Sequence, residues 1–138
     1  MGTKLDMKTI QHMNLFVRIT RVKAKHCFTY NSTMFFTIDK PFLGNVRRED
    51  INQLEKKLNK RIKIIYSPRS KVDLKYFISR IVPYRFKRLS LSDDCLTIFV
   101  SPSNPRTRSI FIGRNKSKLK EISSILEEFF GIKKVLIR

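Results

Sequence analysis

Residues 108–122 read RSIFIGRNKSKLKEI, and the fold of the whole chain can be worked out from this segment. An apolar run leads into Gly113, and apolar residues with helical spacing follow from about residue 117, which predicts a turn between two helices. The first N–H groups of a helix lack partners and carry a partial positive charge, so they attract phosphate. A glycine beside them lets a backbone approach a ligand closely. Four cations surround this corner: Arg114, Lys116, Lys118 and Lys120.

The segment before the glycine, NPRTRSIFI at residues 104–112, predicts a short helix that begins at about Pro105 with Asn104 as its N-cap. We expect its apolar end, which includes Ile112, to pack this helix against the rest of the protein. The segment also adds Arg106 and Arg108. The charges could belong to a solvated helix start, but residues 106–120 hold six cations and no acid. A bound anion would compensate this charge.

Working outward from this segment, the same order of elements is found twice. The first copy has a helix with Asp6 as its cap, two strands joined by a tight turn at Asn31 and Ser32, a basic turn, a helix and a strand. The predicted ranges of this copy are 7–20 for the first helix, 23–30 and 33–39 for the strands, 43–50 for the turn, 49–59 for the second helix and 61–67 for the last strand.

The second copy repeats the plan. Its first helix begins at an S-x-x-D pattern, Ser70 to Asp73, and stops before Pro83. Gly131 is expected to end its last helix. The predicted ranges are 85–92 and 95–101 for the hairpin strands, 117–130 for the last helix and 133–138 for the final strand. This copy has six more residues between hairpin and last helix, which is the room that the short helix needs.

The first copy lacks this extra length. We expect its segment DKPFL, residues 39–43, to be too short for such a helix. Arg47 and Arg48 in its turn are expected to form a surface patch.

Composition limits the class of protein. Hydrophobic residues make up 41% of the 138 residues, enough for a folded core. Lysine and arginine number 30 against 11 acids, a net charge of +19 that favours a polyanionic partner. The sequence contains no apolar run of about 20 residues, so we expect no membrane span. Its start lacks the apolar core of a signal peptide and it has only two cysteines, so we expect a cytoplasmic protein.

Two units of about equal length are expected, residues 1–67 and 68–138. The PRSK sequence at 68–71 is the only plausible linker, and it is short. Because a unit of this size is marginally stable alone, we expect the two to pack together.

Catalysis has little support in the sequence. His12 and His26 are the only histidines, and neither lies in a motif with a nucleophile. Adjacent residues of a strand point to opposite faces, so His26 and Cys27 are not expected to bind one metal ion. Asp93 and Asp94 are explained by turn chemistry. We therefore expect no enzyme, no cofactor and no metal.

Aromatic residues are spread over the predicted strands and the short helix. Core packing is expected for most of them, while one or two on an open face could stack on bases. The residues concerned are Phe28, Phe35, Phe36, Phe99 and Phe111.

A unit of helix, two strands, basic glycine turn, helix and strand resembles the type II KH domain, whose GxxG loop holds the backbone of a single-stranded nucleic acid. Two such units in a short chain resemble the archaeal NusA-like transcription factors. The segment IGRNKSKL (112–119) resembles the IGRxGxNV-type segment of that family, and DINQLEKKLNKRIKII (50–65) resembles the matching helix and strand of the first unit.

The resemblance implies an α+β fold of two tandem type II KH-like units. It also implies binding of single-stranded RNA, the nascent transcript, in transcription elongation or termination beside RNA polymerase. Two alternatives remain open, a basic accessory protein on ribosomal RNA in the ribosome and a protein–protein adaptor with inactive grooves. The RNA-binding residues carried over are Arg106, Arg108, Ile112, Gly113, Arg114, Asn115, Lys116, Lys118 and Lys120, with Arg47 and Arg48 of the first unit.

Both turns depart from the family pattern. In the second unit, Lys116 replaces the closing glycine, which costs about 1 kcal/mol if the residue is left-handed but brings a charge to the phosphate path. In the first unit, no reading frame around Gly44 gives GxxG. In the family, the short helix before the turn forms one wall of the RNA groove, so the resemblance implies a collapsed or closed groove in the first unit. RNA binding is therefore expected chiefly in the second unit.

Overall fold

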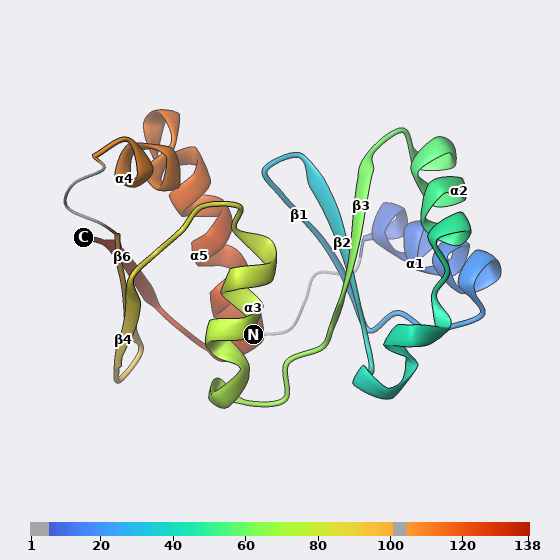
Figure 1. The fold of residues 1–138 in the computed structure, drawn as a ribbon, viewed down its shortest axis with the longest axis horizontal. Helices are drawn as coiled ribbons and strands as arrows, with labels where there is room; N and C mark the ends of the chain where they lie inside the picture. Colours follow the sequence, from blue (N-terminus) through green and yellow to red (C-terminus); the bar gives the residue numbers. More distant parts are fainter. Residues whose placement is uncertain (1–5, 101–104) are drawn as a thin grey trace. The chain divides into compact units, whose positions relative to one another are not determined.

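The computed structural model describes residues 6–100 and 105–138, which form an α+β protein (Figure 1). The chain divides into two compact units, and the boundary falls between Ser67 and Pro68. In the described residues, each unit holds one three-stranded mixed sheet. No helix among these residues has the length and apolar character needed to cross a membrane.

The first unit begins with a helix and a hairpin, as expected. The Asp6 carboxylate accepts a hydrogen bond from the Thr9 amide at 2.8 Å and so caps the first helix. Asn31 and Ser32 both have positive φ, the geometry of a two-residue hairpin turn. The elements are α1 (Met7–Thr20), β1 (His26–Tyr30), β2 (Thr33–Ile38), the 3₁₀ helix η1 (Lys40–Asn45), α2 (Arg48–Leu58) and β3 (Arg61–Tyr66).

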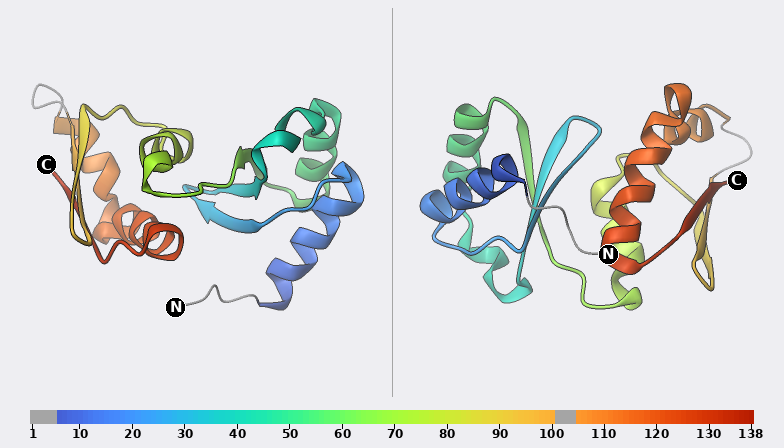
Figure 2. Two further views of the ribbon diagram at one scale, coloured as in Figure 1. Left: turned by 90° about the horizontal axis from the view of Figure 1, so that it is seen from below. Right: turned by 180° about the vertical axis from the view of Figure 1, so that it is seen from behind.

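The sheet of the first unit has the order β1-β2-β3, with β2 antiparallel to β1 and parallel to β3. Figures 1 and 2 show α1 and α2 together on one face of this sheet. The core lies between these helices and the sheet. There the rings of Phe16 and Phe36 stack with their centroids 4.6 Å apart, and Leu54 is fully buried. These residues are thereby removed from water, whereas Ile10 and Val17 of α1 stay partly exposed.

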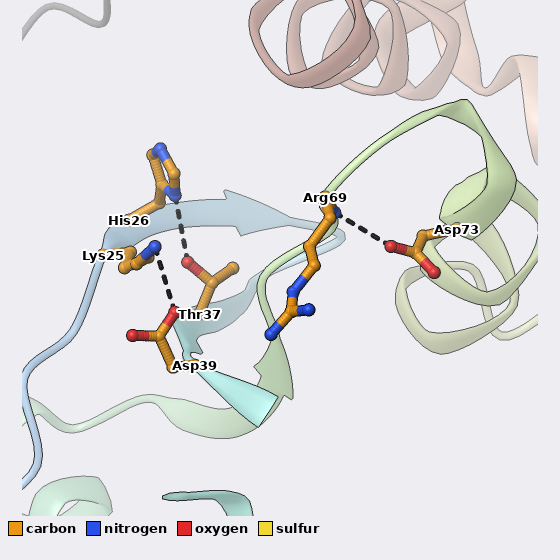
Figure 3. A network of polar contacts seen from close by, with 6 residues as sticks. All are labelled: Lys25, His26, Thr37, Asp39, Arg69 and Asp73. Carbon is orange, nitrogen blue, oxygen red and sulfur yellow. Dashed lines mark hydrogen bonds and ion pairs between the residues drawn. The ribbon is translucent and has the colours of Figure 1, made fainter. Parts of the chain in front are cut away.

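Polar contacts hold the open end of the first hairpin and the start of the second unit (Figure 3). Lys25 pairs with Asp39 at 3.0 Å, and the His26 Nδ1 atom lies 3.1 Å from the buried Thr37 hydroxyl. In the second unit, the Asp73 carboxylate accepts from the Arg69 amide at 2.9 Å. The bonded amide is one residue earlier than the S-x-x-D capping box predicts, and the Ser70 hydroxyl accepts from the Val72 amide at 3.3 Å.

The second unit has the sheet order β4-β5-β6, again antiparallel and then parallel. Leu96 and Ile98 are fully buried beneath its helices, which lie on one face of the sheet (Figures 1 and 2). The elements are η2 (Lys71–Asp73), α3 (Leu74–Ile81), β4 (Arg88–Ser92), β5 (Cys95–Phe99), α4 (Pro105–Ile112), η3 (Arg114–Lys116), α5 (Ser117–Phe130) and β6 (Lys134–Ile137).

Some sequence predictions were wrong in detail. β1 begins at His26 and β4 at Arg88, three residues later than predicted in each case, because a strand begins only where its partner pairs with it. The DKPFL segment does form a short helix, the 3₁₀ helix η1, which has Pro41 in its first turn. A 3₁₀ helix needs only three residues per turn, so the short connection suffices. The predicted cap Asn104 lies outside the described residues.

Candidate nucleic-acid interface

The turn between α4 and α5 has an unusual backbone. Gly113 has φ 76° and ψ 173°, and both Asn115 and Lys116 are left-handed, with φ of 54° and 60°. The Lys116 amide donates to the Gly113 carbonyl at 3.2 Å and closes the turn. The sequence prediction that residue 116 would be left-handed is confirmed. Asparagine tolerates this conformation, whereas lysine adopts it at a cost.

Gly113 has a structural role that the sequence did not predict. A Cβ atom at this position would lie 2.7 Å from the Lys118 Cγ atom and 2.9 Å from the Ser117 hydroxyl. The start of α5 therefore fills the space beside Gly113, and a ligand does not enter there. The glycine is needed because the turn folds back on its own chain at positive φ.

The corner is open to solvent, and no side chain caps the helix that starts there. Arg114, Asn115, Lys116 and Ser117 are all exposed. Lys116 is the N-cap residue of α5, and its side chain makes no capping hydrogen bond. A lysine side chain has no acceptor atom, so it cannot cap these amides. The first turn of α5 contains no acid either, so its positive end is left for an anion.

The six predicted cations do not all have the same surroundings. Arg106, Arg114, Lys116 and Lys120 are exposed. Lys118 is half-buried, and its Nζ atom lies 3.6 Å from the Glu121 carboxylate. The corner cluster therefore consists of Arg114, Lys116 and Lys120, with Lys118 partly neutralised.

Arg108 is also engaged within the protein. Its Nε atom donates to the Ile137 carbonyl at 3.3 Å and so ties α4 to the end of β6. This contact joins residues 29 positions apart, and nothing in the local sequence indicates it. Arg108 thus helps to position α4, the helix that leads into the corner, in addition to any contact with a ligand.

The apolar end of α4 is only partly packed. Phe111 is fully buried, and its ring packs against that of Tyr84 in a T-shaped arrangement with the centroids 5.1 Å apart. Ile112 is half-buried. Ile110 belongs to the apolar end that we expected to pack, but it is 47% exposed, because it points about 100° around the helix from Phe111. Ile110 thus places an apolar surface beside the cations of the corner.

Tyr84 is a residue that sequence reasoning did not connect to this corner. Burial raises the pKa of its phenol, and the nearby Glu121 carboxylate raises it further. The phenol therefore stays protonated and supports α4 through its contact with Phe111. Its position just after Pro83 carries no periodic signal that would have predicted the contact.

The matching turn of the first unit is different. The amide of Arg47 donates to the Asp50 carboxylate at 3.1 Å, and Glu49 also lies in the first turn of α2. These acids already satisfy the positive end of the helix. Val46 has an ordinary extended backbone, so the tight left-handed corner is missing. Arg47 and Arg48 are exposed.

Other titratable groups do not form a reactive cluster in the part of the chain that is described. Burial lowers the pKa of His12, and the charges of Lys8 and Lys60 lower it further. Burial raises the pKa of the Cys27 thiol to about 12. Within residues 6–100 and 105–138, no three histidine, cysteine or acidic side chains lie close enough to hold a metal ion.

Comparison with known proteins adds information on the fold. No protein-family model and no curated protein matches this chain. Its structure is similar to the crystal structure of APE1850, with a TM-score of 0.63 and 23% sequence identity. The match covers 97% of this chain and 100% of that one. The similarity concerns the fold over nearly the full length.

Proposed function

We propose that this protein binds single-stranded RNA and that the corner at residues 113–116 holds the sugar–phosphate backbone. The observation that supports this most is the start of α5, an exposed helix N-terminus without a side-chain cap or an acid in its first turn. Such an end binds phosphate. Exposed cations surround it, and their charge is not matched by acids between residues 105 and 120.

Each group has a defined task in this proposal. A phosphate is attracted by the partial positive charge at the start of α5, while Arg114 and Lys116 approach it from the turn. Arginine can give two parallel hydrogen bonds to a phosphate, and lysine acts as a mobile point charge. The exposed Ile110 on α4 offers an apolar surface on which the neighbouring sugar or base can rest. Since bases are not read at this corner, it binds many sequences.

The proposal includes an evolutionary class. Each unit has the order helix, two strands, helix and strand, with one antiparallel and one parallel pair in its sheet. This order supports two tandem type II KH units, and we propose an archaeal NusA-like factor that acts on nascent RNA. The capped start of α2 supports an inactive groove in the first unit.

Binding of labelled RNA tests the biochemical part. We expect the protein to bind a mixed-sequence single strand of about ten nucleotides and to lose affinity steeply as salt rises from about 50 to 200 mM. Lys116→Asp should weaken binding by about tenfold, because it removes one phosphate contact and adds a repulsive charge. Lys57→Asp, the same charge change at an exposed position of α2, is the control.

The outcomes separate the alternatives. If Lys116→Asp and Lys57→Asp both fold and both weaken RNA affinity slightly and equally, the result would favour diffuse binding to a structured ribosomal RNA. Absence of any RNA binding at physiological salt would favour a protein–protein adaptor. In cell extract, crosslinks to nascent transcripts support the transcription role, whereas co-sedimentation with ribosomal subunits contradicts it.

A further inference from the structure

The open face of the second sheet carries an arginine stacked on an aromatic ring. Arg88 on β4 lies opposite Phe99 on β5, and its guanidinium carbon is 3.8 Å from the ring centroid. The next pair along the strands, Leu89 and Ile98, points to the other face, where Ile98 is fully buried beneath the helices. Arg88 and Phe99 therefore lie on the face away from the helices.

This pair belongs to a cleft at the end of the sheet, which we call the sheet-end cleft. It has a volume of about 570 Å³ and is lined by Lys87, Arg88, Phe99, Val100 and Arg138. Backbone hydrogen bonds hold its walls together, from the Lys87 amide to the Phe99 carbonyl at 2.6 Å and from the Val100 amide to the Arg138 carbonyl at 2.8 Å. Three cations from distant parts of the sequence thus meet in one place.

The acidic side chains of the second sheet lie away from the sheet-end cleft. The acids of this sheet are Asp93 and Asp94, in the turn at the other end of the β4–β5 hairpin. Five residues of extended strand separate the two ends by about 15 Å. In the described part of this unit, the side-chain ion pairs of lysine involve Lys118 and Lys133, which lie outside the cleft.

The chemistry of the cleft suits a nucleotide. A guanidinium that lies on an aromatic ring is held in place, so its N–H groups can bind a phosphate with little further loss of freedom. A base can stack on the exposed side of the guanidinium or on the ring. Lys87 and Arg138 add charge for the phosphate. An acidic peptide would use the cations but would gain nothing from Phe99.

The cleft is linked to the corner through α4. Arg108 donates to the carbonyl of Ile137, the residue before Arg138, so α4 touches the strand end that forms one wall of the cleft. From Arg108 to the corner at Gly113 the helix rises about 8 Å. One single strand can therefore reach from the corner to the wall of the cleft that contains Arg138.

We infer that the sheet-end cleft is a second nucleotide-binding site, which takes a base and a phosphate of the same single strand beyond the part held at residues 113–116. The inference rests on the proposed function for the nature of the ligand. It extends the length of RNA that the second unit contacts, and it assigns to Arg88 and Phe99 a binding role.

Two RNA lengths test it. A strand of about four nucleotides is the length that a KH-type groove holds, whereas one of about twelve can also reach the cleft. We expect wild-type protein to bind the longer strand more tightly. Arg88→Ala and Phe99→Leu should each weaken binding of the longer strand by about tenfold and leave binding of the shorter one unchanged. The control is Arg80→Ala, an arginine over the Tyr76 ring on α3, which should change neither.

Photocrosslinking of the full chain to the longer strand separates this inference from the proposed function. Crosslinks to residues near both Phe99 and Arg114 support both. Crosslinks near Arg114 alone would contradict nucleotide binding in the cleft and support the proposed function. Crosslinks near Phe99 alone would support binding in the cleft and contradict binding at residues 113–116. Absence of crosslinks at either place contradicts both. Equal losses for Arg88→Ala and Arg80→Ala would also overturn the cleft, because they would indicate a general effect of charge.

Discussion

Gly113 and Lys118 approach so closely that a side chain on the glycine would collide with the start of α5. A Cβ atom on Gly113 would lie 2.7 Å from the Lys118 Cγ atom and 2.8 Å from the Lys118 backbone nitrogen. This relationship, and the φ of 76° at Gly113, explain why a glycine stands at the corner of the candidate interface.

The first prediction compares three glycines. Gly113→Ala should reduce the free energy of unfolding by about 2 to 3 kcal/mol, because it combines a glycine-only backbone with a collision. Gly131 has positive φ, but a Cβ atom there would meet only open space. Gly131→Ala should therefore reduce the free energy of unfolding by about 1 kcal/mol. Gly44→Ala, with open space and no positive φ, should have almost no effect. Urea unfolding of the three variants measures this order, and equal effects would contradict it.

The second prediction concerns Lys116, whose left-handed backbone is strained. Lys116→Gly should increase the free energy of unfolding by about 1 kcal/mol because glycine adopts φ 60° without penalty. The same variant should bind RNA more weakly, and its slope of log affinity against log salt should fall by about 0.7, as for one lost phosphate contact. A more stable variant with unchanged salt dependence would show that Lys116 does not contact phosphate.

The third prediction separates the two roles of Arg108. Arg108→Ala should lower the free energy of unfolding by about 1 kcal/mol, since the Ile137 carbonyl loses its donor. Arg108→Lys keeps the charge but cannot reproduce the Nε–H bond, so its loss of stability should be similar while RNA binding falls less. Arg106→Ala, at an exposed position on the same helix, should leave stability nearly unchanged. Thermal unfolding and RNA binding measured on the same samples check these expectations.

The fourth prediction concerns the reactivity of Cys27. Burial raises the pKa of its thiol from 9.0 to about 12, so the folded protein holds roughly a thousandfold fewer thiolates at about pH 8.5 than the unfolded chain. In a Cys95→Ser variant, alkylation of Cys27 should therefore be slow and should become fast in urea. Similar rates in the two states would contradict the buried position.

The same shift has a consequence for stability. Because the folded pKa of Cys27 lies above the unfolded value, its contribution to stability is present below pH 9.0 and is lost as pH rises towards about 12. Cys27→Ala should remove this dependence. The difference between the unfolding free energies of the two proteins, measured at several alkaline pH values, reports it directly.

Helices and turns were predictable because their signals are local. The ranges of α1 and α5 agree with the sequence prediction, since the Asp6 cap, the αL stop at Gly131 and the apolar spacing act within a few residues. The left-handed residue at 116 could likewise be predicted from the altered GxxG pattern. These features depend on hydrogen bonds between residues at most six positions apart.

Tertiary contacts decided the rest. The strand starts at His26 and Arg88, the tie from Arg108 to Ile137 and the stacking of Arg88 on Phe99 depend on which distant segments pair. The local sequence shows how many cations lie near the corner. It does not show which of them form hydrogen bonds or ion pairs within the protein. The amino-acid sequence thus specifies the order of elements and the basic corner, whereas the directions and partners of its side chains arise only when the sheet pairs, because pairing brings together residues that are far apart along the chain.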